Sequence, residues 1–311
     1  AYNPYDFSGL RACEASVWSF FRTFDKSMDK YKKHIMGDAS EEPMPLYVIP
    51  DRKVSLADVR EGMRNHYEGT ELSMTNDPGA GAYKVPYRWR PMTFKSEGRE
   101  YFNERAIATQ QTGFVLIAQM RSWLPDAVGG ILWFGVDDAN TAVLTPMYAS
   151  ITEIPECYRR GNGSMTEFSW TSAFWIHNWV ANMAYNRYEP MIRDIRPVQK
   201  ELEDSYVDLV KNTDAKALEL LKSSPAQATA YLTEVCGKVA NEATARWKKL
   251  GEYLLVKYMD GNVKKEKDGK FEENGYGQIV SPNFPGYSQE YYDQVAKSGE
   301  AKHLEVPKKD K

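Results

Sequence analysis

The stretch 105-RAIATQQTGFVLIAQMRSWLPDAVGGILWFGVDDANTAVLTPMYA-149 decides the fold class, because it holds three runs rich in β-branched and aromatic residues. Such residues favour a pleated, half-buried surface over a helix. The runs at 105–120, 131–136 and 141–148 are therefore expected to form three strands. An Asp-Asp-Ala-Asn turn joins the last two as a hairpin, and a Gly-Gly pair separates that hairpin from the first strand. The most economical topology is an antiparallel meander.

Three polar residues interrupt the first of these runs: Gln110, Gln111 and Thr112. A buried amide without a partner is costly, so such residues normally bond to something specific. Two explanations stay open at this point. The row either belongs to a structural hydrogen-bond network, which is the commoner case, or faces a substrate.

The composition is that of a globular protein with material for a large core: 13% of the 311 residues are aromatic, 27% are charged, and the net charge is −3. This length fits one large domain, or one domain with a helical extension. The charge balance argues against nucleic acid as the main partner, and no apolar run is long enough for a membrane span. The cysteines lie far apart without paired histidines, so neither a metal site nor a disulfide framework is expected.

A loop-rich passage at 70–103 contains the triplet Arg88-Trp89-Arg90 between two prolines. Two guanidiniums that flank an indole can bind a carboxylate bidentately or stack on an aromatic face. Surface ion pairing is the alternative, and the sequence gives it equal weight. The glycine-rich turn upstream is not a phosphate loop, because no Gly-Lys-Ser/Thr follows it.

The second half of the chain is mainly helical. Apolar residues recur every three or four positions at 172–185 and again at 232–254, which predicts two helices with long buried stripes. Between them, a charged amphipathic helix is expected to begin after Pro197. Residues 187–258 are therefore expected to form an antiparallel helical hairpin, and residues 259–311 a polar, turn-rich extension.

Three isolated residues of reactive type are interpreted as structural. Cys13 lies on the apolar face of an N-terminal helix, where a free cysteine behaves as a small hydrophobe. His66 is near the C-terminal end of a short helix. His177 lies among tryptophans, where a histidine is normally a satisfied core residue. None of them is expected to act as a nucleophile, base or ligand.

Six runs of the chain carry a family resemblance, and they are CEASVWSFF, PDRKVSLADVREGMRNHYEGT, GAGAYKVPYRWRP, RAIATQQTGF, MRSWLPDAVGGILWFGVDDANTAVLTPMYA and SAFWIHNWVANMAY. They resemble the later two thirds of the PepD-type dipeptidases, which are N-terminal-nucleophile (Ntn) hydrolases related to secernins and choloylglycine hydrolases. The match covers about residues 1–200 and extends to about 258. It implies an α+β fold, the αββα sandwich of two antiparallel sheets covered by helices. Residues 1–186 would be the C-terminal portion of that domain.

The resemblance also implies where the chemistry resides. In this family the nucleophile is a cysteine at the mature N-terminus, whose α-amino group serves as its base. Ala1 is not such a residue, so the nucleophile, the first strands and an oxyanion-hole asparagine are expected in a segment upstream of it. That segment of the same protein would be a partner of this chain, which is either a processing product or a shortened sequence and would be inactive alone. No cofactor is implied, and relatives with signal peptides point to the periplasm or to secretion.

The expected function is therefore that of the C-terminal portion of a cysteine dipeptidase, which cleaves short peptides through a thioester acyl-enzyme. Arg88 or Arg90 would hold a substrate carboxylate, and the row 110–112 would face the cleft. Asp138 and Asn140, at the hairpin turn, are weaker candidates. Two alternatives remain: a choloylglycine-type amidase acting on acyl-amides, and a non-catalytic binding protein with a hydrolase-like fold. The oligomeric state stays open, a homo-oligomer included.

Overall fold

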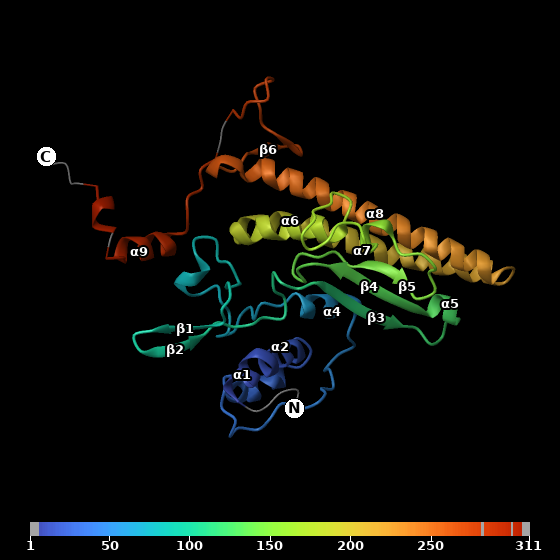
Figure 1. The fold of residues 1–311 in the computed structure, drawn as a ribbon, viewed down its shortest axis with the longest axis horizontal. Helices are drawn as coiled ribbons and strands as arrows, with labels where there is room; N and C mark the ends of the chain where they lie inside the picture. Colours follow the sequence, from blue (N-terminus) through green and yellow to red (C-terminus); the bar gives the residue numbers. More distant parts are fainter. Residues whose placement is uncertain (1–5, 281–282, 300, 307–311) are drawn as a thin grey trace.

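The computed structural model describes residues 6–280, 283–299 and 301–306, and its elements mix helix and sheet, which confirms the α+β class (Figure 1). Ala1 and the end of the polar extension, 307–311, lie outside the described residues. The α-helices are α1 (Phe7–Gly9), α2 (Ala15–Arg22), α3 (Lys32–Ile35), α4 (Leu56–Met63), α5 (Asp126–Gly129), α6 (Ala173–Asn186), α7 (Tyr188–Leu221), α8 (Pro225–Tyr258) and α9 (Gln289–Lys297). The strands are β1 (Thr93–Ser96), β2 (Arg99–Phe102), β3 (Phe114–Met120), β4 (Gly130–Val136), β5 (Thr145–Tyr148), β6 (Glu266–Lys267) and β7 (Lys270–Phe271).

The largest sheet is the three-stranded meander β3-β4-β5, and both of its pairings are antiparallel. The meander predicted for residues 105–149 is thereby confirmed. Two of the strands are shorter than predicted, because β3 starts at Phe114 and β5 at Thr145. Residues 109–112 form a turn instead, closed by the Thr112 amide, which donates to the Thr109 carbonyl at 3.0 Å. The polar row at 110–112 therefore precedes the strand and does not lie within it.

Two helices of 34 residues each, α7 and α8, run side by side against one face of this sheet (Figure 1). They are joined by only three residues, in which Ser224 caps α8 by accepting a hydrogen bond from the Gln227 amide. The buried residues of α8 include Leu232, Trp247 and Leu254, so the stripe predicted at 232–254 is confirmed. None of the helices in the described part of the chain is long and apolar enough to cross a membrane.

Helix α7 begins earlier than the sequence predicted, because it continues through Pro197. A proline inside a helix removes one backbone hydrogen bond and crowds the preceding turn. Burial on both sides of it offsets that cost: Ile195 is fully buried and Gln199 nearly so. The Gln199 side chain donates to the Ala142 carbonyl at 2.6 Å, which fastens α7 to the β4–β5 connection. The division of the chain at 186 and 258 into three regions stays a prediction.

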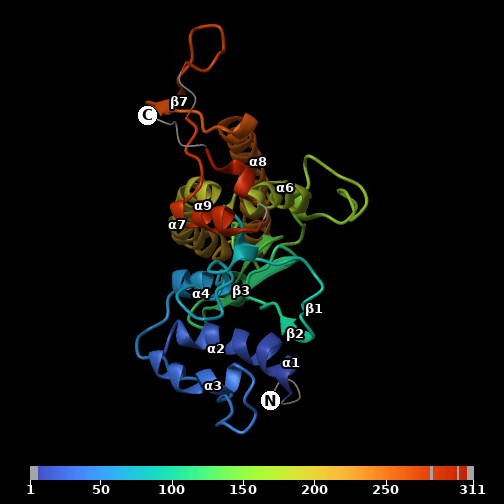
Figure 2. The same cartoon turned by 90° about the vertical axis from the view of Figure 1, so that its left-hand side faces the viewer.

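A buried ion pair joins the N-terminal half of the chain to the helical half. The Arg64 guanidinium, just after α4, donates to the Glu203 carboxylate on α7 at 2.6 Å, and both side chains are buried. Glu203 also accepts from the Leu144 amide at 3.0 Å. Leaving either charge without its partner would cost about 3–5 kcal/mol. Figure 2 shows α4 and the sheet lying between the N-terminal helices α1 to α3 and the helices α6 to α8.

The two faces of the meander differ sharply. On one face, Ile131, Trp133 and Tyr148 are buried, and the Tyr148 hydroxyl donates to Asp214 of α7 at 2.6 Å. On the other face, Phe114 is 62% and Met120 74% exposed. Within the described residues, the other two sheets have only two strands each, so the second layer of an αββα sandwich is not seen there. Such an apolar, solvent-facing sheet surface is uncommon in a self-contained domain and indicates an interface.

Candidate functional site

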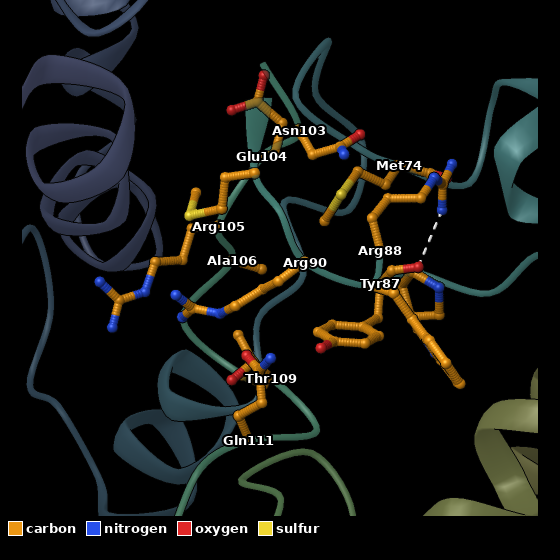
Figure 3. Close-up of a pocket in the computed structure, with 14 residues that line it drawn as sticks. Met74, Tyr87, Arg88, Arg90, Asn103, Glu104, Arg105, Ala106, Thr109 and Gln111 are labelled. Carbon is orange, nitrogen blue, oxygen red and sulfur yellow. Dashed lines mark hydrogen bonds between the residues drawn. The ribbon is translucent and has the colours of Figure 1, made fainter. Parts of the chain in front are cut away.

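A polar cleft lies between the loop at 87–90, the turn at 110–111 and one face of α6. Its volume of about 400 Å³ falls within the ~300–1,000 Å³ typical of small-molecule sites. Four of its lining side chains carry amides, one carries a positive charge and two are aromatic. These residues are Tyr87, Trp89, Arg90, Gln110, Gln111, Asn178 and Asn182. Tyr87, Trp89, Arg90 and Gln111 also line an adjoining depression, which reaches toward Asn103 and Thr109 (Figure 3).

The two arginines of the Arg-Trp-Arg triplet have different surroundings. Arg88 points away from Arg90 (Figure 3), and its guanidinium donates to the Met74 carbonyl at 2.6 Å and to Asp77 at 2.7 Å. It also donates to the carbonyls of Val85 and Tyr87. These four bonds hold the loop together, so Arg88 is occupied. Arg90 is exposed, lines the cleft and makes no hydrogen bond or ion pair with any described residue.

A chain of amide hydrogen bonds orients the α6 wall of the cleft. Gln110 donates its side-chain amide to the Asn182 side-chain oxygen, and Asn182 donates to the Asn178 carbonyl at 2.7 Å. Asn178 in turn donates its side-chain NH₂ to Asp137 Oδ1 at 2.8 Å. The amide orientations follow from these partners. The structural-network explanation for Gln110 is therefore correct as far as its NH₂ is concerned, while the residue still lines the cleft.

Asp137 lies directly behind this wall, at the end of β4. Its backbone has a φ of 69°, a left-handed conformation that Asp tolerates better than most residues. The side chain is 1% exposed, and its second oxygen, Oδ2, has no partner among the described residues. Burial raises the pKa of this carboxyl to about 7. Asp137 is therefore a buried carboxyl group with only one of its two oxygens hydrogen-bonded by a side chain. That one bond connects it to Asn178, which lines the cleft.

The neighbouring residues Asp138 and Asn140 belong to a different, buried network. Asp138 accepts from the Tyr185 hydroxyl at 3.1 Å, and Asn140 accepts from the Tyr188 hydroxyl at 3.0 Å. His66 contacts the same Tyr185 hydroxyl at 3.0 Å. Both Asp138 and Asn140 are fully buried and neither lines the cleft. Asp138 and Asn140 therefore connect the hairpin turn to the end of α6 and the start of α7. Their predicted role in substrate binding stays a prediction, and none of their contacts supports it.

Of the seven residues predicted for the site, the structure brings Arg90, Gln110 and Gln111 together at the cleft. Thr112 does not line it, and its hydroxyl accepts from the Thr109 amide at 3.4 Å within the turn. The sequence analysis missed Asn178 and Asn182. The sequence pattern could have indicated them, because Asn178, Asn182 and Asn186 recur every four residues on α6 and so lie on one face of the helix. Asparagine is a poor helix former, so three of them on one face are unusual.

The remaining reactive residues are not at the cleft. His177 is buried and stacks on Trp247 with ring centroids 5.1 Å apart, which confirms its assignment to the core. Its Nδ1 atom has no hydrogen-bond partner among the described residues, so it is not the fully satisfied histidine that was expected. Burial lowers its pKa to about 3, so it is neutral at physiological pH. Burial also raises the pKa of the Cys157 thiol, and that of Cys236 to about 11, so neither is a ready thiolate. The described residues contain no group of three His, Cys, Asp or Glu that could hold a metal ion.

Comparison with known proteins places these features in a family. Residues 1–201 match the model of peptidase family C69. The chain is 26% identical over 262 residues to a probable dipeptidase B of Lactococcus lactis subsp. lactis, which covers 82% of this chain and 48% of the relative. It is 26% identical to a probable dipeptidase of Latilactobacillus sakei, and that match covers 73% of this chain and 46% of the relative. It is 22% identical to dipeptidase A of Lactobacillus helveticus, with 55% of this chain and 30% of the relative covered. The chain thus spans about half the length of the first two relatives. Because the family model matches well over half of it, the chain belongs to peptidase family C69.

Proposed function

We propose that this chain is the C-terminal portion of a cysteine dipeptidase, which hydrolyses short peptides through a thioester acyl-enzyme. The observation that carries the proposal is Arg90, an unpaired guanidinium facing a cleft lined by side-chain amides. A guanidinium suits a peptide's terminal carboxylate, because its planar fork offers two parallel donors. Side-chain amides pair with the N–H and C=O groups of a peptide bond. Relatives named as dipeptidases agree with this reading.

The nucleophile in this proposal comes from another segment of the same protein. Its thiolate would attack the peptide carbonyl, the amine would leave with a proton from the base, and water would then hydrolyse the thioester. Neither Cys157 nor Cys236 suits that role, because both are buried with raised thiol pKa values. The residues of this chain would bind and orient the peptide, and a closed cleft would exclude water from the reacting bond.

The exposed sheet face supports the same proposal. In the Ntn sandwich that we infer, a second sheet would pack on the face that presents Phe114, Leu116 and Met120, all of which are exposed here. The outer edge of β3 is also unpaired within the described residues, since β3 pairs with β4 alone. An apolar face next to an open strand edge is the surface that another layer of chain would cover.

The native protein, purified from its source, tests this proposal. We expect hydrolysis of unmodified dipeptides, loss of activity on thiol alkylation, and an N-terminal cysteine peptide recovered with the label. Intact mass and N-terminal sequencing would show whether a second segment accompanies the chain. Turnover of acyl-amides but not of dipeptides would instead indicate a choloylglycine-type amidase. Absence of an alkylatable N-terminal cysteine, together with no turnover, would indicate a binding protein.

A further inference from the structure

The α6 wall of the cleft offers hydrogen-bond acceptors. Asn182 and Asn186 each donate their side-chain NH₂ to the backbone carbonyl four residues earlier, both at 2.7 Å. Asn178 commits its NH₂ to Asp137, at 2.8 Å. The amide oxygen is the only acceptor of such a side chain, and it stays available to a ligand when the NH₂ group donates elsewhere. Asn182 gives that oxygen to Gln110, whereas the oxygen of Asn178 has no partner among the described residues.

In its ionised form, which a pKa of about 7 leaves populated at neutral pH, Asp137 gives this acceptor wall a negative field. Its carboxylate lies behind Asn178, nine-tenths or more buried, with one oxygen bonded to Asn178 and the other without a partner in the described part of the chain. An uncompensated charge in a poorly polarisable interior acts over a longer distance than one in water. Asn178 is polarised by this bond, which strengthens its outward oxygen as an acceptor. A cation in the cleft would supply the compensation that Asp137 lacks.

The opposite side of the cleft has the opposite polarity. Arg90 is the cation among the residues that line it, and no carboxylate lines it. Glu104, the carboxylate that lines the adjoining depression, is paired with Arg11. Tyr87 and Trp89 also line the cleft and offer aromatic faces that can receive a cation. The cleft therefore matches a small molecule with a donor cation at one end and an anion at the other.

We propose that Asn178, oriented and polarised by Asp137, binds the free α-ammonium group of the peptide, while Arg90 binds its carboxylate. This inference rests on the proposed function and adds the recognition of a free N-terminus to it. Asn178 touches the substrate in this arrangement. Asp137 acts through Asn178 and is a positioning residue. The site would select short zwitterionic peptides over their N-blocked forms, because an amide N–H brings no charge to the acceptor wall.

The test compares a dipeptide with its des-amino analogue, in which hydrogen replaces the α-ammonium group. In the native protein we expect kcat/KM to be at least about tenfold higher for the dipeptide, the effect of one charged hydrogen bond. Asn178→Ala should reduce this preference by about tenfold, because kcat/KM should fall for the dipeptide by that much more than for the analogue. Asp137→Asn, which tolerates the left-handed backbone, should reduce the preference severalfold in the same direction.

Asn186→Ala is the matched control, because Asn186 makes the same bond to its own helix but does not line the cleft. It should leave the preference unchanged. Equal loss of activity on both substrates in Asn178→Ala, or no preference in the native protein, would overturn the inference while leaving the dipeptidase proposal intact. If no dipeptide is hydrolysed at all, the proposed function fails, and calorimetric binding of the two compounds to this chain decides the inference alone. Equal affinity for both would then overturn it.

Discussion

Replacing each arginine of the Arg-Trp-Arg triplet by lysine should separate a ligand-binding role from a structural one. Arg90 lines the cleft and has no partner among the described residues. Lysine at 90 keeps the charge but loses the planar fork that binds a carboxylate through two donors. Arg88 already uses its guanidinium for four hydrogen bonds, of which the shortest, to the Met74 carbonyl, measures 2.6 Å. Lysine at 88 has three donors at one point and cannot reproduce them.

The expected magnitudes differ accordingly. A charged contact contributes about 1.5–3 kcal/mol, which corresponds to roughly tenfold to a hundredfold in kcat/KM. Because Arg90 is exposed and screened by solvent, the lower end applies, about tenfold for Arg90→Lys. The loss should shrink for peptides with an amidated C-terminus, since a neutral amide gains less from a guanidinium. Arg88→Lys should lower the melting temperature by a few degrees, because it releases several backbone carbonyls of the loop.

The assay measures kcat/KM of the native protein and both variants on one dipeptide and on its C-terminal amide, with thermal unfolding in parallel. The reasoning is refuted if Arg88→Lys shows the carboxylate-dependent loss and Arg90→Lys does not, because the roles would then be exchanged. If neither substitution changes kinetics or melting temperature, the loop at 87–90 is a solvated connection and the site is elsewhere.

Three further predictions concern the rest of the chain. The isolated chain 1–311 should not hydrolyse dipeptides, because its three cysteines are all internal; turnover abolished by Cys13→Ala would contradict this. In helix α8, Gly237→Ala should raise stability by about 0.5–1 kcal/mol, since nothing lies within 4 Å of the added methyl. Gly251→Ala should lower it by about 1–3 kcal/mol, because its methyl would clash with the Trp179 ring; equal effects of the two substitutions in thermal unfolding would exclude this packing. The pKa of His177 falls from 6.5 to about 3 on burial, so the unfolded chain takes up a proton that the folded chain does not. Stability should therefore fall by about 1.4 kcal/mol per pH unit as pH drops below 6.5 toward 3, and urea titrations of His177→Gln should lack that component.

The sequence determined the elements that depend on local pattern. The runs around Phe114 and Ile131 are strands because their β-branched and aromatic residues suit a pleated surface, and the stripe from Leu232 to Leu254 is helical because its period is that of a helix. The capping box of Ser55 and Asp58 likewise marks the start of α4, because both of its reciprocal hydrogen bonds lie within three residues of chain. Each of these features is encoded within a few residues of chain.

The tertiary structure decided which polar groups are available to a ligand. Two arginines separated by one residue look alike in sequence, yet Arg88 is occupied by groups from 74 to 87 and Arg90 is not. Asp137 meets Asn178, 41 positions away, and that contact helps to orient the wall of the cleft. Whether a polar side chain is satisfied depends on partners that folding brings from distant parts of the chain. Local pattern specifies backbone conformation and burial, but it carries no record of those partners.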